Sequence, residues 1–280
     1  MRALVLSDLH YVLGDPASAR RLSVIDSISG KFDAVLLCGD NAELSSDDFQ
    51  NHATLFGNLR KKFDCPMGAV VGNHELWGRK KGVSSSLLID KVFPAIFRDY
   101  KITSLEHENL SVGDTTFVGT YGHFDYSLFK PGNGVTMDDV RLGKFNTGER
   151  IIGWEDIESM DWPGRAHEKV CADLVSKFED RLKSAKGKKI SLSHTIPDSS
   201  LNSWPDSPKQ SFMGAYAGSR LIGDALERNG GVYHFCGHTH SEARADIGKT
   251  SVFNIGQDDR KPGIRYIILH DEELALCWSK

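Results

Sequence analysis

The sequence predicts an α/β fold, because short apolar runs alternate with segments of helical periodicity. Runs of this length, bounded by turn residues, are typical of buried strands. A polar motif follows each run directly, so its side chains are expected at a strand end, where open α/β sheets bind their ligands. The five runs cover residues 3–6, 34–38, 69–71, 190–192 and 232–236.

Helices are predicted between the first strands. Helical patterns place one helix around 18–29 and another around 47–63, and each leads into the next strand. A third helix is predicted over 83–99, kinked or ended near Pro94. Proline lacks the backbone N–H that a helix interior uses, which is why the helix is expected to change there.

The second half of the chain predicts a hairpin, a long helix and three closing strands. Val112 and Thr115 flank a Gly-Asp turn between β-rich runs, so a hairpin continuing to Tyr121 is expected. An amphipathic helix around 165–185 is supported by apolar residues at spacing four, namely Val170, Leu174, Phe178 and Leu182. Strands near 250–255, 264–270 and 274–278 would complete a second sheet.

Two stretches lack a clear period. Residues 122–164 combine aromatic residues, glycines and mixed charges, and residues 196–218 follow His194 directly. Loops this long inside a compact domain usually have a function or are disordered. We therefore expect one domain over residues 1–280, in which these two stretches are insertions that wall the cleft at the strand ends.

Five polar motifs occur in a fixed order along the chain. They are Asp8-Leu9-His10, Gly39-Asp40-Asn41-Ala42-Glu43, Gly72-Asn73-His74-Glu75, Ser193-His194 and Gly237-His238-Thr239-His240. Each motif alone is common, but an accidental occurrence of all five is very improbable. The glycines let the backbone turn sharply and approach an ion or a phosphate closely.

The side chains in these motifs narrow the chemistry. Carboxylate, amide and imidazole ligands without cysteine suit first-row divalent ions such as Mn, Fe, Zn or Co. Without a metal, these polar groups would be crowded together with little to offset their desolvation. Two ions about 3.5–4 Å apart can acidify a shared water and clamp a phosphoryl oxygen. The motifs therefore indicate hydrolysis of a phosphoester.

On these motifs the chain resembles the calcineurin-like metallophosphoesterase superfamily. The resemblance covers nearly the whole chain, from Asp8 to His240. It implies a two-sheet β-sandwich flanked by helices on both sides, as one catalytic domain. It also implies a metal-dependent phosphoester hydrolase, in which a hydroxide bridging two divalent metals attacks phosphorus in line.

The resemblance implies a set of metal ligands. The first metal would be held by Asp8, His10, Asp40 and His240, and the second by Asp40, Asn73, His194 and His238. Asp40 would bridge the two ions. Manganese is the first choice for both, with Fe, Zn, Co and Ni as alternatives.

Two further positions match the catalytic residues of the family. His74 matches the histidine that protonates the leaving oxygen or stabilises the phosphoryl charge. Glu43 matches the acidic position that orients this histidine, and a carboxylate there would fix its tautomer and raise its pKa.

Departures from the family pattern disfavour one branch and leave others open. The protein serine/threonine phosphatase branch has Asp-Arg-Gly where this chain has Glu43-Leu44-Ser45, so its phosphate-gripping arginine is missing. A nuclease or phosphodiesterase acting on nucleic acid stays open, although that branch usually has a longer chain. A catalytically inactive scaffold is the other alternative, but all seven ligands and His74 are present. The sequence does not decide between monoester and diester substrates.

Three residues in the first insertion are candidates for substrate binding. Arg141 or Arg150 would bind the substrate, and His123 ends a strand from which it could point into the cleft. The alternative for the two arginines is surface packing or a dimer contact.

Composition and charge limit the partners. A net charge of −4 gives no strong signal for nucleic-acid binding and favours a phosphorylated small molecule as substrate. The five cysteines are an odd number and are scattered, which is typical of thiols in a reducing compartment. The first apolar run is too short for a signal peptide or a membrane span, so a cytoplasmic protein is expected. Relatives are often dimers, so a homodimer is compatible with the resemblance.

Overall fold

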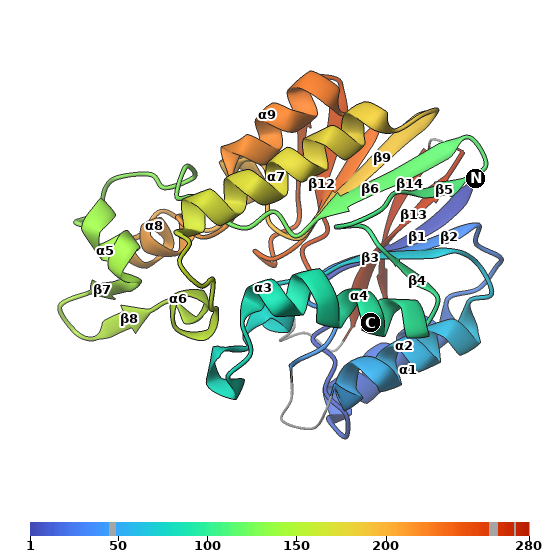
Figure 1. The fold of residues 1–280 in the computed structure, drawn as a ribbon, viewed down its shortest axis with the longest axis horizontal. Coiled ribbons are helices and arrows are strands. Elements are labelled where there is room, and N and C mark those ends of the chain that lie inside the picture. Colours follow the sequence, from blue (N-terminus) through green and yellow to red (C-terminus); the bar gives the residue numbers. More distant parts are fainter. Residues whose placement is uncertain (45–48, 258–262, 272, 280) are drawn as a thin grey trace.

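The computed structural model describes residues 1–44, 49–257, 263–271 and 273–279. Within these ranges, two six-stranded sheets pack face to face (Figure 1). The first sheet has the order β14 (Glu273–Ser279), β13 (Ile264–His270), β1 (Arg2–Leu6), β2 (Ala34–Cys38), β3 (Met67–Val70) and β4 (Ile102–Ser104). The second has the order β11 (Ala243–Ile247), β12 (Thr250–Asn254), β10 (Tyr233–Cys236), β9 (Lys188–Ser193), β6 (Thr115–Thr120) and β5 (Leu110–Val112).

The centre of each sheet is parallel and its edges are antiparallel. Strands β1 to β4 pair in parallel, as do β6, β9, β10 and β12. The antiparallel pairs are β1 with β13, β13 with β14, β5 with β6, and β11 with β12. Parallel neighbours end at the same edge of a sheet, so the loops that follow β1, β2 and β3 are close together.

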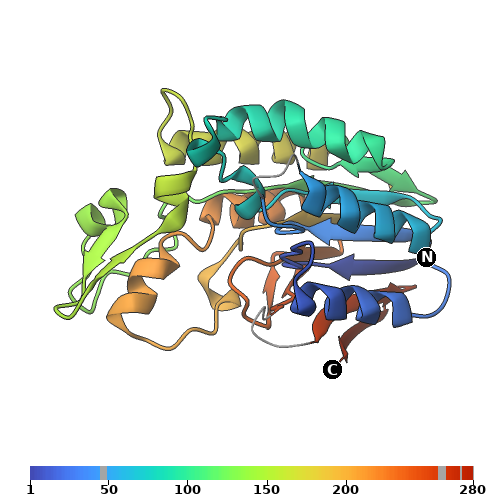
Figure 2. The same ribbon diagram turned by 90° about the horizontal axis from the view of Figure 1, so that it is seen from below.

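Helices cover the outer faces of both sheets (Figures 1 and 2). Those on the first sheet are α1 (Pro16–Ser27), α2 (Gln50–Lys62), α3 (Ser85–Leu87) and α4 (Phe93–Asp99), and those on the second are α7 (His167–Ser184) and α9 (Arg220–Asn229). No helix in the described ranges combines the length and the apolar character needed to cross a membrane. The layers thus follow the four-layer order helix, sheet, sheet, helix, and the predicted fold class is confirmed.

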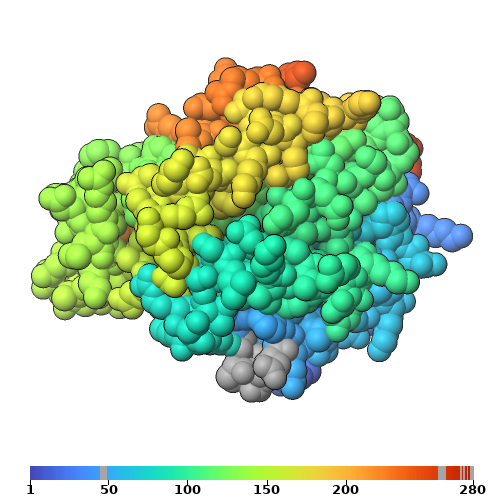
Figure 3. All heavy atoms as spheres, in the orientation of Figure 1, coloured from blue at the N-terminus to red at the C-terminus, as the bar shows by residue number. Residues whose placement is uncertain are grey.

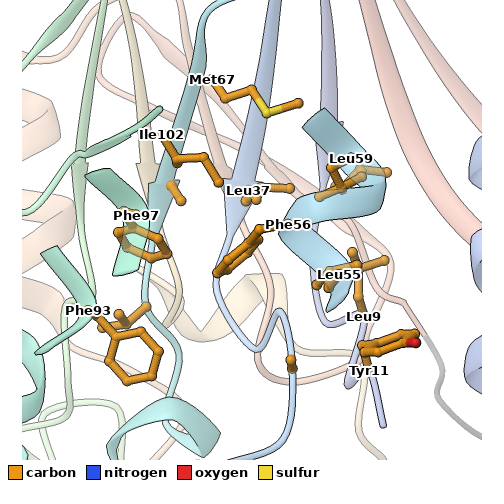
Figure 4. Packing of buried hydrophobic residues seen from close by; sticks show 14 of the residues in the cluster. Leu9, Tyr11, Leu37, Leu55, Phe56, Leu59, Met67, Phe93, Phe97 and Ile102 are labelled. Atoms are coloured by element: carbon orange, nitrogen blue, oxygen red, sulfur yellow. The ribbon is translucent and has the colours of Figure 1, made fainter. Parts of the chain in front are cut away.

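Alternation of side chains along β1 explains these layers. Ala3 and Val5 belong to the apolar cluster between the two sheets, whereas Leu4 and Leu6 belong to the cluster beneath the helices. Successive residues of a strand point to opposite faces, so a continuous apolar run is what a strand buried on both faces requires. In the outer cluster, residues of α2 and α4 such as Phe56 and Phe97 pack around Leu37 of β2 (Figure 4).

The strands predicted from apolar runs and the helices predicted around 18–29 and 165–185 are all present. The helix predicted from residue 47 begins at Gln50, and residues 45–48 lie outside the described ranges. The hairpin is formed by β5 and β6. Over 83–99, a π-helical turn (Leu88–Val92) separates α3 from α4, and Pro94 lies in the first turn of α4. The π turn thus lies directly before the turn that contains the proline, which has no backbone N–H to donate.

One prediction about the closing strands was wrong. Only β12 belongs to the second sheet, while β13 and β14 extend the first sheet, with Arg2 opposite His270. Strand β13 pairs with the edge of β1 that β2 leaves open. Its side chains Ile267 and Leu269 are buried. Strand β11, at the edge of the second sheet, had no predicted counterpart. Its residues alternate between half-buried and exposed, so it has no continuous apolar run.

The two stretches without a clear period contain short elements. These are α5 (Met137–Leu142), β7 (Lys144–Asn146), β8 (Ile151–Gly153) and α6 (Glu155–Ser159) in the first, and α8 (Pro208–Gly214) with a 3₁₀ turn (Ser199–Leu201) in the second. Together they form a lobe that projects from the body of the molecule (Figure 3). The lobe has its own apolar cluster, in which Phe124, Phe145, Phe212 and Tyr216 take part.

A buried carboxyl group in this fold gives a testable pH dependence. Glu106 accepts a hydrogen bond from the backbone N–H of Val71 at 2.7 Å and one from the hydroxyl of Ser104 at 3.2 Å. Burial raises the pKa of Glu106 from 4.5 to about 7. The folded state therefore holds this proton more tightly than the unfolded chain does.

The stabilising contribution of protonated Glu106 is complete below pH 4.5 and is lost as the pH rises through about 7. We expect Glu106→Gln, whose amide oxygen can keep the Val71 bond, to remove this loss, which amounts to about 3 kcal/mol. The measurement is the free energy of unfolding of both proteins by denaturant at pH 4.5, 6 and 8. A difference between the two proteins that stays constant with pH would contradict the assignment.

Candidate metal centre

The predicted ligands follow five different strands. Asp8 and His10 come after β1, Asp40 after β2 and Asn73 after β3 of the first sheet. From the second sheet, His194 follows β9, and the motif with His238 and His240 follows β10. Both sheets direct these strand ends toward the lobe (Figure 1), so that ligands far apart in the sequence meet at one place.

The backbone turns unusually at these positions. Asp8, His10, Asp40, His238 and His240 have positive φ angles, of 52°, 42°, 47°, 68° and 54°. A residue other than glycine in this region costs on the order of 1 kcal/mol or more, and such residues are concentrated at functional sites. The five left-handed residues are all members of the ligand groups, so the unusual backbone is confined here to positions whose side chains meet.

Asp40 lies between two groups of ligands. Its Oδ2 is 3.6 Å from Nε2 of His10 and 3.4 Å from Nε2 of His194. The side chain is 2% exposed. Burial acts to raise the pKa of Asp40, but the neighbouring histidines hold it well below its usual range, so the group is a carboxylate. Its position is that expected of a bridging ligand.

The first group contains Asp8, His10 and His240. Nε2 of His240 is 3.2 Å from Nε2 of His10 and 3.7 Å from Oδ1 of Asp8. Oδ1 of Asp8 also accepts the backbone N–H of His238 at 2.9 Å, and its Oδ2 accepts the hydroxyl of Ser7 at 2.6 Å. These bonds fix the carboxylate so that it faces the imidazoles.

The second group is centred on the amide oxygen of Asn73. This Oδ1 is 2.8 Å from Nε2 of His194 and 3.0 Å from Nδ1 of His238. Burial lowers the pKa of His194, but the Asp40 carboxylate raises it more, to about 9. Burial lowers the pKa of His238 to about 3. A neutral His238 is the form that binds a metal.

The second nitrogen of three imidazoles is held by an acceptor. Nδ1 of His10 contacts Oε1 of Glu43 at 2.9 Å, and Nδ1 of His194 donates to the carbonyl of Cys38 at 3.0 Å. Nε2 of His238 donates to the carbonyl of Tyr216 at 3.1 Å. Such bonds fix the tautomer and leave the inward nitrogen as an acceptor. Where the inward nitrogen faces another acceptor atom, a cation has to lie between them, either a proton, as the raised pKa of His194 allows, or a metal ion that takes its place. The oxygen and imidazole atoms that converge here suit divalent metal ions, one in each group.

His74 is beside the centre and is in contact with Glu43. Its Nδ1 contacts Oε2 of Glu43 at 2.8 Å, while its Nε2 is 3.8 Å from Oδ2 of Asp40. Burial lowers the pKa of His74, but Asp40 and Glu43 raise it more, to about 9. Glu43 thus contacts both His10 and His74. Burial acts to raise the pKa of Glu43, but the hydrogen bonds from the two histidines lower it more, to about 2. His74 is also close enough to His10 and Asp40 to form a further possible ligand group.

Two carboxylates with supporting positions had no predicted role. Glu75 is buried and accepts four backbone N–H groups, from Asp40, Asn41, Ala42 and Gly72, at 2.6 to 3.2 Å. It thereby ties the loop after β2 to the loop after β3. The motif that contains Glu75 was recognised in the sequence, and its position next to His74 was the only local signal.

Asp156, on α6 of the lobe, is the second of these carboxylates. Its Oδ1 accepts from Nδ2 of Asn73 at 3.0 Å and from the indole of Trp77 at 2.6 Å, and its Oδ2 accepts from the indole of Trp154 at 3.0 Å. The bond to Asn73 turns the amide oxygen toward His194 and His238. No sequence signal connects Asp156 with Asn73, because the two are 83 positions apart.

The three residues predicted to bind substrate make their contacts with residues other than the metal ligands. Arg141 on α5 is exposed, and its guanidinium is 3.9 Å from the carboxylate of Glu168. Arg150 is exposed and precedes β8. His123 is buried, with Nε2 2.9 Å from Nδ1 of His167. Within the described ranges, no hydrogen bond or ion pair joins any of the three to a metal ligand.

Solved structures share this fold. A phosphopantetheinyl hydrolase (PptH) from Mycobacterium tuberculosis has a TM-score of 0.71 and 19% identity, over 90% of this chain and 88% of that one. The purple acid phosphatase PPD1 of yellow lupin has a TM-score of 0.54 and 12% identity, over 100% of this chain and 51% of that one. GAP50, described as the anchor in the inner membrane complex of Plasmodium, has a TM-score of 0.51 and 10% identity, over 99% of this chain and 84% of that one.

At these identities, the similarity to solved structures shows the fold alone. No curated protein matches the chain in sequence. The family model of the calcineurin-like phosphoesterases matches residues 1–242, which include every ligand of the two groups. The chain therefore belongs to the calcineurin-like phosphoesterase family and is a phosphoester hydrolase.

Proposed function

We propose that the protein hydrolyses a phosphoester with two divalent metal ions, one in each ligand group. The observation that carries the proposal is the position of Asp40, whose Oδ2 is within 3.6 Å of imidazoles from both groups. Manganese is our first choice of metal, with Fe, Zn, Co and Ni as alternatives, because oxygen and imidazole ligands suit all of them. When bound, the ions would activate water as the nucleophile and offset the charge of the phosphoryl oxygens.

The side chains of the protein have distinct roles in this proposal. Asp40 bridges the two groups, and Asn73 completes the second with its amide oxygen. His74, with its Nε2 toward the centre, protonates the departing oxygen or stabilises the phosphoryl charge. Glu43 fixes the orientation of His74 through the bond to Nδ1 and holds His10 with its other oxygen.

The structural neighbours support this reading at the level of chemistry. Two of the three are named for phosphoester cleavage, one as a phosphopantetheinyl hydrolase and one as an acid phosphatase. GAP50 is named as an anchor, so the fold also occurs in a protein described by a structural role. The complete ligand set around Asp40 favours the enzyme over a scaffold for this chain. A net charge of −4 gives no positive support to nucleic acid as the substrate.

We also propose that the protein works in a reducing compartment such as the cytoplasm. All five cysteines are free thiols, and Cys38, Cys171 and Cys236 are buried in the core. Free cysteines that pack as small apolar residues are common where disulfides do not form.

The proposed chemistry predicts metal-dependent turnover of simple esters. Metal-stripped protein should be inactive on p-nitrophenyl phosphate and bis-p-nitrophenyl phosphate, and should recover turnover when Mn, Fe, Co, Ni or Zn is added singly. The ratio of the two rates distinguishes monoester from diester chemistry. His74→Asn is the control for contaminating phosphatases. No turnover of either ester with any metal, although two ions are bound, would contradict the proposal for these substrates and favour a scaffold.

A further inference from the structure

The carboxylate of Asp156 is buried where the lobe meets the metal centre. Its side chain is 1% exposed and accepts three N–H groups, from the amide of Asn73 and from the indoles of Trp77 and Trp154. Oδ1 accepts the first two, and Oδ2 accepts the third. Burying a carboxylate costs free energy unless donors surround it, so these three bonds hold the group in one orientation.

Contacts on both sides of Asp156 hold its helix in place. Lys80 donates to the carboxylate of Glu155 at 2.7 Å, and Arg79 donates to the carbonyl of Ile157 at 3.2 Å. Both donors closely follow the third polar motif in the sequence. Helix α6 is therefore joined to the segment that leaves the metal centre, and a displacement of the lobe would break the bonds of Asp156.

The amide of Asn73 can present either of its ends to the second ligand group. In this structure its Oδ1 faces Nε2 of His194 and Nδ1 of His238. A half-turn about the last side-chain bond would place the N–H₂ group there instead, and this group cannot bind a cation. The turned amide would also set its oxygen against the Asp156 carboxylate, and two acceptors repel. Asp156 thus selects the orientation that can bind an ion.

Trp77 links Asp156 to the imidazole of His74. Its indole N–H donates to Asp156 at 2.6 Å, and its ring lies against the imidazole, with ring centroids 3.8 Å apart and an angle of 33° between the planes. Nδ1 of His74 is in contact with Glu43 at 2.8 Å. One carboxylate therefore contacts the edge of the imidazole, and the other fixes the aromatic ring that packs on its face.

We propose that Asp156 is a positioning residue for the second metal ion and for His74, acting through the Asn73 amide and the Trp77 indole. The inference rests on the proposed function, because it assigns Asp156 to the same centre. Asp156 has for the second group the part that Glu43 has for the first. Each carboxylate lies outside the predicted ligand set, contacts one predicted ligand and supports His74, so the lobe is a working part of the metal centre.

Two variants separate the orientation of the Asn73 amide from the charge of Asp156. Asp156→Asn keeps an oxygen for Asn73 and Trp77, because the opposite orientation would set its N–H₂ group against two donors. Asp156→Leu removes all three bonds. We expect Asp156→Leu to weaken binding of the second ion about 10–100-fold, the usual scale for a lost support of a ligand, and Asp156→Asn to stay within a few-fold of the natural protein. Equal weakening in both variants would overturn the orienting role.

Variants that bind a single ion identify which ion is affected. His240→Ala removes a ligand of the first group and His238→Ala removes one of the second, so each is expected to keep one ion. The measurement is calorimetric titration of metal-stripped protein with Mn²⁺. Asp156→Leu should weaken the ion that remains in His240→Ala and leave unchanged the one in His238→Ala. Equal weakening in both would overturn the proposal, since it would indicate a general loss of structure.

Folding of the Asp156 variants is checked by thermal unfolding. If Asp156→Leu does not fold, Asp156→Ala takes its place, because the smaller side chain leaves room for water to bind the three donors. The expected and the contradicting results are the same for both substitutions.

Trp77→Phe tests the contact with His74, because it deletes the indole N–H and keeps an aromatic ring. We expect normal metal affinity and a loss of kcat of about tenfold, with the same dependence on the leaving group as His74→Asn but smaller in size. In the His74→Asn background it should cause no further loss. Trp162→Phe is the matched control, since its buried indole N–H has no partner in the described ranges. A different leaving-group dependence, or an equal effect of the control, would overturn the link to His74.

The metal titrations require no turnover, so failure of this proposal and failure of the proposed function are distinguishable. Selective weakening of the second ion by Asp156→Leu, in a protein that hydrolyses no ester, would support the positioning of Asn73 and overturn the proposed hydrolysis. Unchanged metal affinity and rate in Asp156→Leu, in a protein that does hydrolyse esters, would overturn the role of Asp156 alone.

Discussion

Asp40→Asn is expected to reduce turnover below detection and to lower the amount of bound metal. The carboxylate is positioned between the two ligand groups, so its loss is expected to affect both proposed ions at once. An amide of the same shape is a weaker ligand and brings no negative charge to offset two cations. Hydrolysis of p-nitrophenyl phosphate and metal content by elemental analysis, after equilibration at matched free metal, are the two measurements.

Asp26→Asn on α1 is the matched control, because it makes the same chemical change at an exposed position. It should leave both measurements unchanged. If Asp40→Asn kept two ions per chain and measurable turnover, the bridging role would be wrong, and the two ligand groups would be independent.

His74→Asn is expected to keep nearly normal metal content while turnover falls about 10²–10⁴-fold, the usual scale for a lost general acid. The structure sharpens this prediction, since His74 is close enough to His10 and Asp40 to act as a ligand instead. A general acid matters most for a poor leaving group. The loss should therefore be larger for an alkyl phosphate than for p-nitrophenyl phosphate.

Two results would separate the possible roles of His74. Metal loss equal to that of Asp40→Asn would make it a ligand. An equal loss of rate for good and poor leaving groups would leave it stabilising phosphoryl charge and not transferring a proton. Glu43→Gln serves as a second variant, because it weakens the support of both His74 and His10 while both imidazoles remain.

Local sequence patterns predicted most of the strands and helices. The apolar run of β1 is buried on both faces, so its composition alone predicts a central strand, and the turn at Asp8 follows it directly. Such patterns do not predict which neighbour a strand pairs with. The apolar pattern of β13 fits either sheet, and its position beside β1 depends on which edge remains open. The elements of the lobe are three to seven residues long, too short to show a period.

In the metal centre too, local motifs predicted some residues, while others depend on the folded structure. The ligand candidates stand in short motifs next to strands, so the sequence could name them and the family resemblance could assign them. Asp156 could not be found in this way, because its role exists only once the lobe is folded against Asn73. A pocket lined by residues within 128–133 and 196–217 has the same origin. It is built from two distant stretches whose lengths, but not their shapes, are visible in the sequence.

The distribution of the ligands along the chain has a consequence for folding and synthesis. The first group joins Asp8 to His240, so its geometry requires that the first and the last motif be brought together across both sheets. A nascent chain has no complete site until its second sheet has formed, and closing so long a loop is slow compared with local folding. We therefore expect ion binding to follow the folding of both sheets, and a chain shortened before residue 240 would keep the early motifs but lack the complete first group.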